Sequence, residues 1–412
     1  MAERHLPVRP NLDQLRRQAK DLLRALKAGD SEAASALARL HPRRPEASAA
    51  KLADAQLVLA RQYGVASWPR LVLACRMTAA ICGDDLATVR DLVLTHPELL
   101  DEDARGVKGN WGPPMSYAAN LGRDAIIDLL HGLGAKDLGF AFDRACLQGR
   151  LATARKLYDL GARPRAGAVM GPCETLNADG LAFLIDLGTA IADEQGDPLA
   201  PLGLILQTYC RNPPGKRRCL DLLDRRGIAL PDTPVMAVHR GRIDLLEDHL
   251  RRDSGLFRRT FTHDEIWPRA LGCAEDPSLA LHGTPLAGGT LLHLSVDDDS
   301  LDLLGWMLAH GADADAPAAI DAEGFGGHSA LFGCVVSQPY RSGIRTDDTV
   351  ARLLLDHGAD PRRRASLRKR LRFVDDETEH AYHEVDPLDW GRRFHDQAWV
   401  NPAVMACLRS RR

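Results

Sequence analysis

Three things are scarce in this 412-residue sequence: aromatic residues, unbalanced charge and long apolar runs. Aromatic residues make up 5% of the chain, so we expect cores built from Leu, Ala and Val. The formal net charge of −3 provides no general field for nucleic acid or an anionic membrane, and either would need a local patch. Nowhere do 18 uncharged apolar residues run together, and the N-terminus lacks an apolar segment with a small-residue cleavage site. We therefore expect neither a membrane span nor export.

Cysteine occurs without any pairing pattern. The nine cysteines are scattered singly, their number is odd and no CxxC is present. A chain of this length does not need disulfides to hold a core. These features predict reduced thiols in a cytoplasmic protein. The length also exceeds that of one compact core, which leaves either two or three domains or a solenoid.

One short design recurs along the chain, consisting of an apolar helix end, a glycine and a polar exit. It occurs in LLHGLGAKD (129–137), LYDLGARP (157–164), FLIDLGTAI (183–191), LLDRRGIALPD (222–232), WMLAHGADA (306–314) and LLLDHGADP (353–361). Glycine suits the left-handed position after a helix C-terminus. Matching helix starts lie upstream, the clearest in PPMSYAANLGRDAIIDLLHGLGAKD (113–137). The pattern therefore predicts that each unit forms two antiparallel helices, the first with small side chains and the second rich in leucine.

These starts and ends resemble the ankyrin repeat family, whose unit opens with TPLHxAAxxGH and closes with LLLxxGAD. The start is matched by Pro114, Met115, Ala118, Ala119 and Gly122, the end by Gly358, Ala359 and Asp360, and the histidine position by His293. The resemblance covers roughly residues 66–412. It implies an all-α, ankyrin-like helical solenoid of about eight or nine units with short β-hairpin fingers. Uneven glycine spacing places long inserted loops near 282–290, 317–328 and 362–386.

Residues 1–65 lack the repeat and predict an N-terminal helical capping module. Leucine and alanine recur at helical spacing after Asn11, a plausible helix cap, and Gly29 is a plausible stop. Two further helical stretches follow, with HPRRP as the turn between them. Terminal units of a stack need a polar outer face, which such a module supplies.

The stretch DAEGFGGHSALFGCVV (321–336) places three glycines and a histidine before a helix start. Gly327 to Ser329 fit the GxT of a repeat start, whereas Gly324 to Gly326 form an additional turn. The spacing is not GxGxxG, because Ser329 stands at the third glycine position. A plain tight loop and a ligand-contacting loop both remain open.

The segment 362–386 carries a basic half, Arg364 to Arg372, followed by an acidic half. This order predicts a charged hairpin with a DDET turn. The acidic residues cancel the field of the basic ones within about one Debye length, roughly 8 Å, so we expect a solvated finger and no nucleic-acid binding. His380 and His383 lie in EHAYHE, which matches neither HExxH nor HxxEH, and we expect no metal site.

The last repeat start, LDWGRRFHD, combines an aromatic ring with two arginines and a histidine, groups typical of recognition surfaces. Together with the 321–336 loop it provides our candidate binding residues: Phe325, His328, Trp390, Arg392, Arg393 and His395. The alternative is that Trp390 merely packs under the inserted hairpin.

The resemblance implies a non-enzymatic intracellular module that binds a partner protein through its concave face and finger loops. No Ser/His/Asp order, activated cysteine or paired-carboxylate signature occurs, and Thr262 or Asp264 in the HDEIW region (263–267) is better explained as a helix cap. The alternative is an enzyme or small-molecule binder with a polar pocket formed by the inserted loops. We expect a monomer without a cofactor, and neither nucleic acid nor membrane as a partner.

Overall fold

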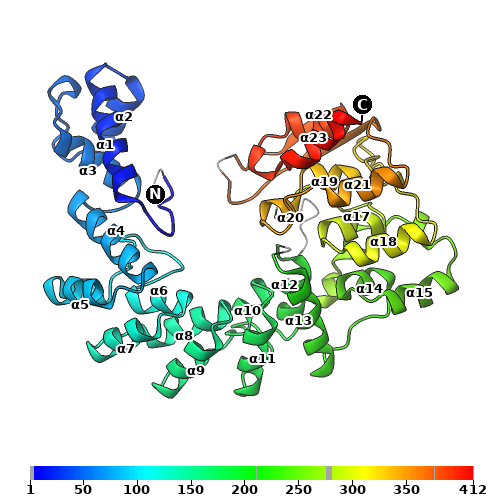
Figure 1. Ribbon diagram of the computed structural model, residues 1–412, viewed down its shortest axis with the longest axis horizontal. Helices are drawn as coiled ribbons and strands as arrows, with labels where there is room; N and C mark the ends of the chain where they lie inside the picture. Colours follow the sequence, from blue (N-terminus) through cyan, green and yellow to red (C-terminus); the bar gives the residue numbers. More distant parts are fainter. Residues whose placement is uncertain (1–3, 210, 275–280, 375, 412) are drawn as a thin grey trace. The chain divides into compact units, whose positions relative to one another are not determined.

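The computed structural model describes residues 4–209, 211–274, 281–374 and 376–411. It is almost entirely helical, as the sequence predicts, and the helices follow one another in pairs (Figure 1). The chain divides into two compact units, Met1–Arg165 and Ala166–Arg412, and each is described by itself. The predicted boundary between residues 65 and 66 stays a prediction, since helices on both of its sides belong to the first unit.

The first unit begins with three helices, α1 (Leu12–Lys27), α2 (Ser31–Leu40) and α3 (Leu52–Gln62). The Asn11 side chain caps α1 by accepting a hydrogen bond from the Gln14 N–H at 2.9 Å. Apolar residues at helical spacing, among them Leu15 and Ala19, turn inward and pack against Leu59 of α3. This confirms the predicted helical stretch and its cap.

Three helix pairs complete the first unit. They are α4 (Trp68–Cys82) with α5 (Leu86–Thr95), α6 (Pro114–Leu121) with α7 (Asp124–Gly132), and α8 (Leu138–Leu147) with α9 (Leu151–Asp159). In α6 every residue from Pro114 to Asn120 is buried, because small side chains let α4 and α8 approach from both sides. The proline opens the helix at a position whose N–H would have no partner in any case.

The second unit contains six further pairs. They are α10 (Met170–Glu174) with α11 (Ala178–Asp186), α12 (Ala200–Gln207) with α13 (Pro213–Arg225), α14 (Pro234–Arg240) with α15 (Ile243–Arg252), α17 (Leu291–Asp297) with α18 (Leu301–Ala309), α19 (Leu331–Val335) with α21 (Thr349–Asp356), and α22 (Pro387–Arg393) with α23 (Pro402–Ser410). Short helices α16 (His263–Ile266) and α20 (Gln338–Arg341) lie in the connections. Single 3₁₀ turns occur at Ala47–Ala49, Pro97–Leu100, Leu256–Arg258, Arg269–Leu271 and Gln397–Trp399. The first helices of neighbouring pairs contact each other: α14 contacts α17, and α17 contacts α19. This is the stacking expected of repeats.

The repeat ends have the predicted backbone. The six glycines at 134, 161, 188, 227, 311 and 358 all have positive φ, between 82° and 111°. A side chain there would be strained, so the recurring glycine is explained by the turn itself.

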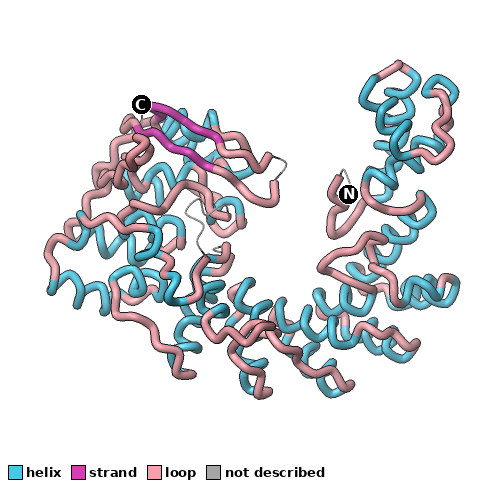
Figure 2. Tube along the Cα trace, turned by 180° about the vertical axis from the view of Figure 1, so that it is seen from behind, coloured by secondary structure: helices cyan, strands magenta, loops and turns pink. Residues whose placement is uncertain are grey.

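One β-hairpin is present in the described residues, formed by β1 (Ala365–Lys369) and β2 (His380–Val385) (Figure 2). The strands are antiparallel and place Leu367 opposite Tyr382. This confirms the predicted hairpin. Asp375 of the predicted DDET turn lies outside the described residues.

Hydrogen bonds between main chains join the finger segments of the second unit side by side. The Gly288 N–H donates to Phe261 O at 2.7 Å, and the Ala319 N–H donates to Gly288 O at 2.8 Å. The Gly326 N–H continues the series by donating to Ser366 O of β1 at 2.7 Å. The inserted loops are therefore held against one another rather than splayed into solvent.

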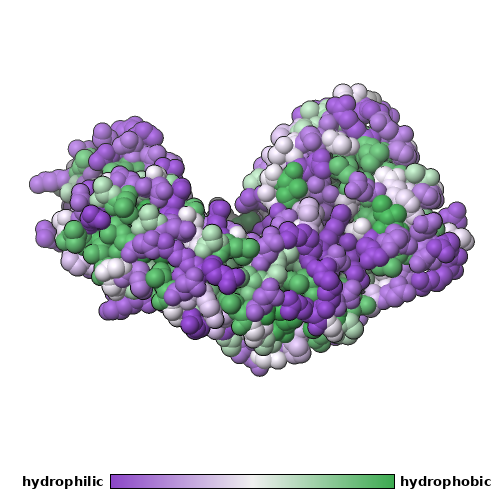
Figure 3. Space-filling view, turned by 60° about the horizontal axis from the view of Figure 1, so that its bottom comes forward, coloured by the Kyte–Doolittle hydropathy of each residue, from purple (hydrophilic) through white to green (hydrophobic). Residues whose placement is uncertain are grey.

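None of the helices in the described ranges is both long and apolar enough to cross a membrane. On the face shown in Figure 3, hydrophobic residues form several separate patches between hydrophilic ones. The eight described cysteines carry free thiols, in line with the prediction, and Cys210 lies outside the described residues.

Candidate functional site

The three inserted loops of the second unit meet around one cavity of about 410 Å³, which we name the loop-lined cavity. It is lined by Thr262, His263, Pro285, Ala287, Gly288, Ala319, Ile320, Asp321, Phe325, Gly326, His328, Leu367, Arg368, Arg370 and Glu379. All three predicted insertions, 282–290, 317–328 and 362–386, contribute to this lining. The sequence analysis raised a pocket formed by these loops as its alternative, and the structure shows one cavity that residues of all three line.

The glycine-rich turn is a structural join that also forms a cavity wall. Gly326 has φ 129°, and a Cβ added there would lie 2.1 Å from the Ala319 carbonyl oxygen. Only glycine therefore allows this close approach of two fingers. Phe325 and Gly326 also line the cavity.

Apolar and charged groups alternate around the cavity. Ile320 leaves 67% of its surface exposed, which is unusual for a large apolar residue. Arg368 contacts Asp321 at 2.8 Å, also pairs with Glu323, and lies over the Phe325 ring with its guanidinium carbon 4.9 Å from the ring centre. The N–H of Phe325 and the Arg368 charge hold the pKa of Asp321 below its usual value.

Two charged side chains on the hairpin side of the cavity lack a partner. Among the described residues, neither Arg370 nor Glu379 makes a side-chain hydrogen bond or an ion pair. Both line the cavity together with the apolar residues Ile320 and Phe325. The cavity thus offers one positive and one negative group that the fold itself does not use.

Two buried histidines support the wall. His328 Nε2 donates a hydrogen bond to Pro285 O at 2.9 Å, and His293 Nε2 donates one to His328 O at 3.0 Å. The other ring nitrogen of His328, Nδ1, is buried and has no hydrogen-bond partner among the described residues. Burial lowers the pKa of His328 to about 4 and that of His293 to about 3. Both rings are therefore neutral near pH 7.

The structure divides the six predicted binding residues into two groups. Phe325 and His328 line the loop-lined cavity, whereas Trp390, Arg392, Arg393 and His395 are not among its lining residues. The two arginines are exposed. His395 Nδ1 lies 2.7 Å from the Tyr382 hydroxyl, and its ring stacks on His380 with centres 4.1 Å apart.

Trp390 requires a correction. We expected its ring to face the hollow of the stack, but it is fully buried. Its Nε1–H donates to Thr284 Oγ1 at 3.2 Å, and its ring lies edge-on to Tyr382 of the hairpin at 4.8 Å. The packing alternative is therefore the one observed, because the hairpin covers α22 and excludes water from the indole.

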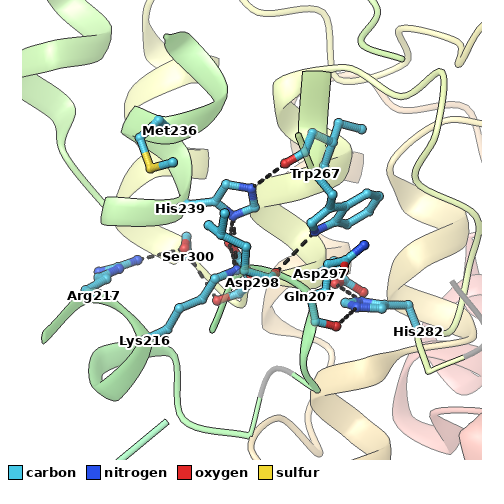
Figure 4. Close-up of polar contacts among 12 residues, drawn as sticks. Gln207, Lys216, Arg217, Met236, His239, Trp267, His282, Asp297, Asp298 and Ser300 are labelled. Carbon is cyan, nitrogen blue, oxygen red and sulfur yellow. Dashed lines mark hydrogen bonds and ion pairs between the residues drawn. The ribbon is translucent and has the colours of Figure 1, made fainter. Parts of the chain in front are cut away.

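Sequence reasoning missed a second polar cluster, the buried acidic turn, defined as Asp297, Asp298 and Asp299 at the end of α17. Figure 4 shows Asp297 and Asp298 with their partners. Asp298 accepts from Lys216 Nζ at 2.9 and 3.2 Å, and Lys216 also contacts His239 Nδ1 at 3.0 Å. Asp297 contacts His282 Nδ1 at 2.8 Å. These two neighbouring carboxylates thus enter separate contacts, with partners 82 and 15 residues away in the chain.

The third carboxylate, Asp299, receives two hydrogen bonds from Arg345 at 2.9 and 3.0 Å. Burial alone would raise the pKa of Asp298, but the Lys216 ammonium outweighs it and holds that pKa below its usual value. Burial together with Lys216 lowers the pKa of His239, whose Nε2 donates to Ile266 O at 3.0 Å. The Lys216 and Asp298 side chains are 6% and 10% exposed, so this turn is closed to a ligand and holds helix pairs together.

The signal for this turn in the sequence is the run of three acids directly after a buried helix. From the sequence, this acidic run indicated only a turn. Its basic partners Lys216 and Arg345 could not be recognised, because they lie 82 and 46 residues away in the chain.

Nucleophile and metal chemistry find little support in the side chains described. Burial raises the pKa of Cys75 to about 11 and that of Cys146 to about 12, so these thiols stay protonated at neutral pH. The described ranges hold no group of three or more His, Cys, Asp or Glu side chains arranged to bind a metal ion. The HDEIW stretch is a helix start, because Thr262 and Glu265 form a reciprocal capping box.

No protein-family model matches this chain, and no curated protein sequence does. Among solved structures, the chain is similar to the crystal structure of the human ASB11 ankyrin repeat domain, at 17% sequence identity and a TM-score of 0.26. The match covers 73% of this chain and 97% of that domain. So loose a superposition carries no argument of its own, and the conclusion that this chain has a repeat helical fold rests on its paired and stacked helices.

Proposed function

We propose that this chain is a protein-binding module whose second unit takes a short segment of a partner in the loop-lined cavity. The observation that carries the proposal is the convergence of three separate inserted loops on one cavity. A pure scaffold has little need of three long insertions in neighbouring units. The proposal keeps the expected cytoplasmic location and monomeric state.

The chemistry of the cavity defines the segment. Ile320 and Phe325 offer an apolar surface for one apolar side chain of the partner. Arg370 and Glu379 are without partners of their own among the described residues and fit one acidic and one basic residue beside it. The preferred segment is therefore an apolar residue between one acidic and one basic residue.

A displayed peptide library with a fixed apolar centre and variable flanks tests this specificity on the purified chain. We expect enrichment of peptides with one acid and one base, and loss of binding in Ile320→Lys. Arg370→Glu should lose these peptides and bind those in which the acid is replaced by lysine, because the charge pairing is reversed. Arg409→Glu, an exposed arginine outside the cavity lining, is the matched control and should bind as the unmodified chain does.

Enrichment without a charge preference, or an Arg370→Glu variant with unchanged preference, would contradict the proposal. The second candidate function is small-molecule binding, which the cavity volume favours because ligand pockets usually measure about 300–1,000 Å³. Native mass spectrometry would support it if a compound copurified with the chain and was lost in Ile320→Lys.

A further inference from the structure

A second cavity of the Ala166–Arg412 unit has a different chemistry. It measures about 420 Å³ and lies between the end of α12, the short helix α20 and the segment that follows β1. The residues that line it include Tyr209, Arg211, Gln338, Arg341, Arg372, Phe373 and Trp399. We name it the aromatic–arginine cavity.

The charge of this cavity is of one sign. Three arginines line it, and no carboxylate does among the described residues. Arg211 approaches Glu174 only at 3.4 Å and lies over the Tyr209 ring at 4.5 Å. Arg341 and Arg372 make no side-chain hydrogen bond or ion pair within the described part of the chain. The fold therefore leaves at least two guanidinium groups available to an anion.

Exposed aromatic rings accompany the charge. Phe373 leaves 79% of its surface exposed, the highest value among the large hydrophobic residues named as exposed. Its backbone is left-handed, with φ 62°, and its N–H donates to Glu377 Oε1 at 2.8 Å. An unfavourable backbone region thus holds an exposed ring at the cavity. Such a ring, with the half-buried Tyr209, suits stacking on a flat ligand.

Two buried polar atoms at this cavity lack partners. Trp399 is 3% exposed and its Nε1 donor has no hydrogen bond. Gln338 is 1% exposed, its Nε2 donates to Ser342 Oγ at 3.1 Å, and its Oε1 acceptor has no hydrogen bond. Leaving a buried donor and a buried acceptor unpaired is costly, at about 1–3 kcal/mol each. Both residues line the cavity.

We propose that the aromatic–arginine cavity binds a mononucleotide, that is, a flat heterocycle bearing a phosphate group. The guanidinium groups of Arg341 and Arg372 match the planar acceptor geometry of phosphate, and its double negative charge suits a cavity that three arginines line. Phe373 and Tyr209 provide faces for the heterocycle. This site is separate from the loop-lined cavity and does not depend on the proposed protein partner.

Calorimetric titration of the full chain with the four ribonucleoside 5′-monophosphates tests the assignment. We expect at least one to bind at least tenfold more tightly than its own nucleoside or inorganic phosphate. Arg341→Glu and Arg372→Glu should each weaken binding at least tenfold, and Phe373→Ala by a smaller factor. Arg409→Glu should leave binding unchanged, since this exposed arginine lies outside the cavity lining.

Melting curves of all variants establish that they are folded, which is expected because the changed side chains are exposed. Binding of none of the four nucleotides up to millimolar concentration would overturn the proposal. So would equal affinity for benzoate, which has a ring and a carboxylate but no phosphate. A single-stranded oligonucleotide that binds more tightly than any mononucleotide would show that the surface serves a polymer instead, and would also overturn it.

Discussion

The buried acidic turn and the two cavities are charged regions of one unit, and they differ in whether their charges are paired. Asp298 meets Lys216 at 2.9 Å in the interior, and Asp299 takes two hydrogen bonds from Arg345. Arg370 and Arg341, at the cavities, have no partner within the described part of the chain. An ion leaves water only when a partner offsets the cost of its desolvation, so pairing marks charges that serve the fold. Unpaired charges at a cavity are those left for a ligand.

The largest effect should follow from breaking the buried pair. Asp298→Ala leaves the Lys216 ammonium buried without its carboxylate, and we expect a loss of about 3–5 kcal/mol in the free energy of unfolding. Glu247→Ala, which removes an exposed acid from α15, is the control and should change it by less than about 0.5 kcal/mol. Urea titration followed by circular dichroism measures both. Similar losses of unfolding free energy in the two variants would show that the Asp298–Lys216 pair does not stabilise the fold.

A substitution of Trp390 tests whether this side chain stabilises the fold or serves a binding surface. Trp390→Ala removes a fully buried ring, and we expect it to cost about 3–5 kcal/mol of stability. Arg392→Ala, two residues along the same helix, changes an exposed side chain and should cost less than about 0.5 kcal/mol. The melting temperatures of the two variants, measured under the same condition, distinguish the two roles. A Trp390→Ala variant as stable as Arg392→Ala would favour a role of Trp390 in binding.

Acidification should destabilise the wall of the loop-lined cavity through its two buried histidines. His328 has a folded-state pKa of about 4 and His293 of about 3, both below the usual value near 6.5. Between pH 6.5 and 4 the unfolded chain therefore binds protons that the folded chain does not, and stability falls as pH falls. Each histidine contributes up to about 1.4 kcal/mol per pH unit.

The control for this effect is His328→Gln, which keeps a side-chain donor for Pro285 O but cannot titrate in this range. Denaturant unfolding between pH 7 and 5 should show a shallower loss of stability in the variant. Identical pH slopes in the two proteins would mean that His328 titrates normally in the folded state.

The smallest effects on stability should come from the unpaired arginines. Arg370→Ala and Arg341→Ala remove no contact on which the described fold depends, and we expect changes below about 0.5 kcal/mol. Arg345→Ala removes two hydrogen bonds to the Asp299 carboxylate and should cost about 1.5–3 kcal/mol. Thermal unfolding of the three variants side by side sharpens the comparison, and equal losses would remove the distinction between paired and unpaired charges.

Local features were predictable from the sequence because their causes lie within a few residues. Asn11 caps α1 through the N–H of Gln14, three residues away. Gly358 ends α21 with φ 99° because the chain must turn in the left-handed region there. The hairpin formed by β1 and β2 was predicted from a basic run followed directly by an acidic one. Helix starts, repeat ends and the finger are therefore properties of short stretches.

The sequence by itself determined the repeat helical fold and its glycine-marked helix ends. Only the tertiary structure decided what the insertions and charges do. Trp390 is covered through contacts with Thr284, 106 residues away, and Lys216 finds Asp298 at a separation of 82 residues. Whether a side chain is buried, paired or left at a cavity depends on such distant neighbours, because desolvation and pairing are set by everything that packs around the group.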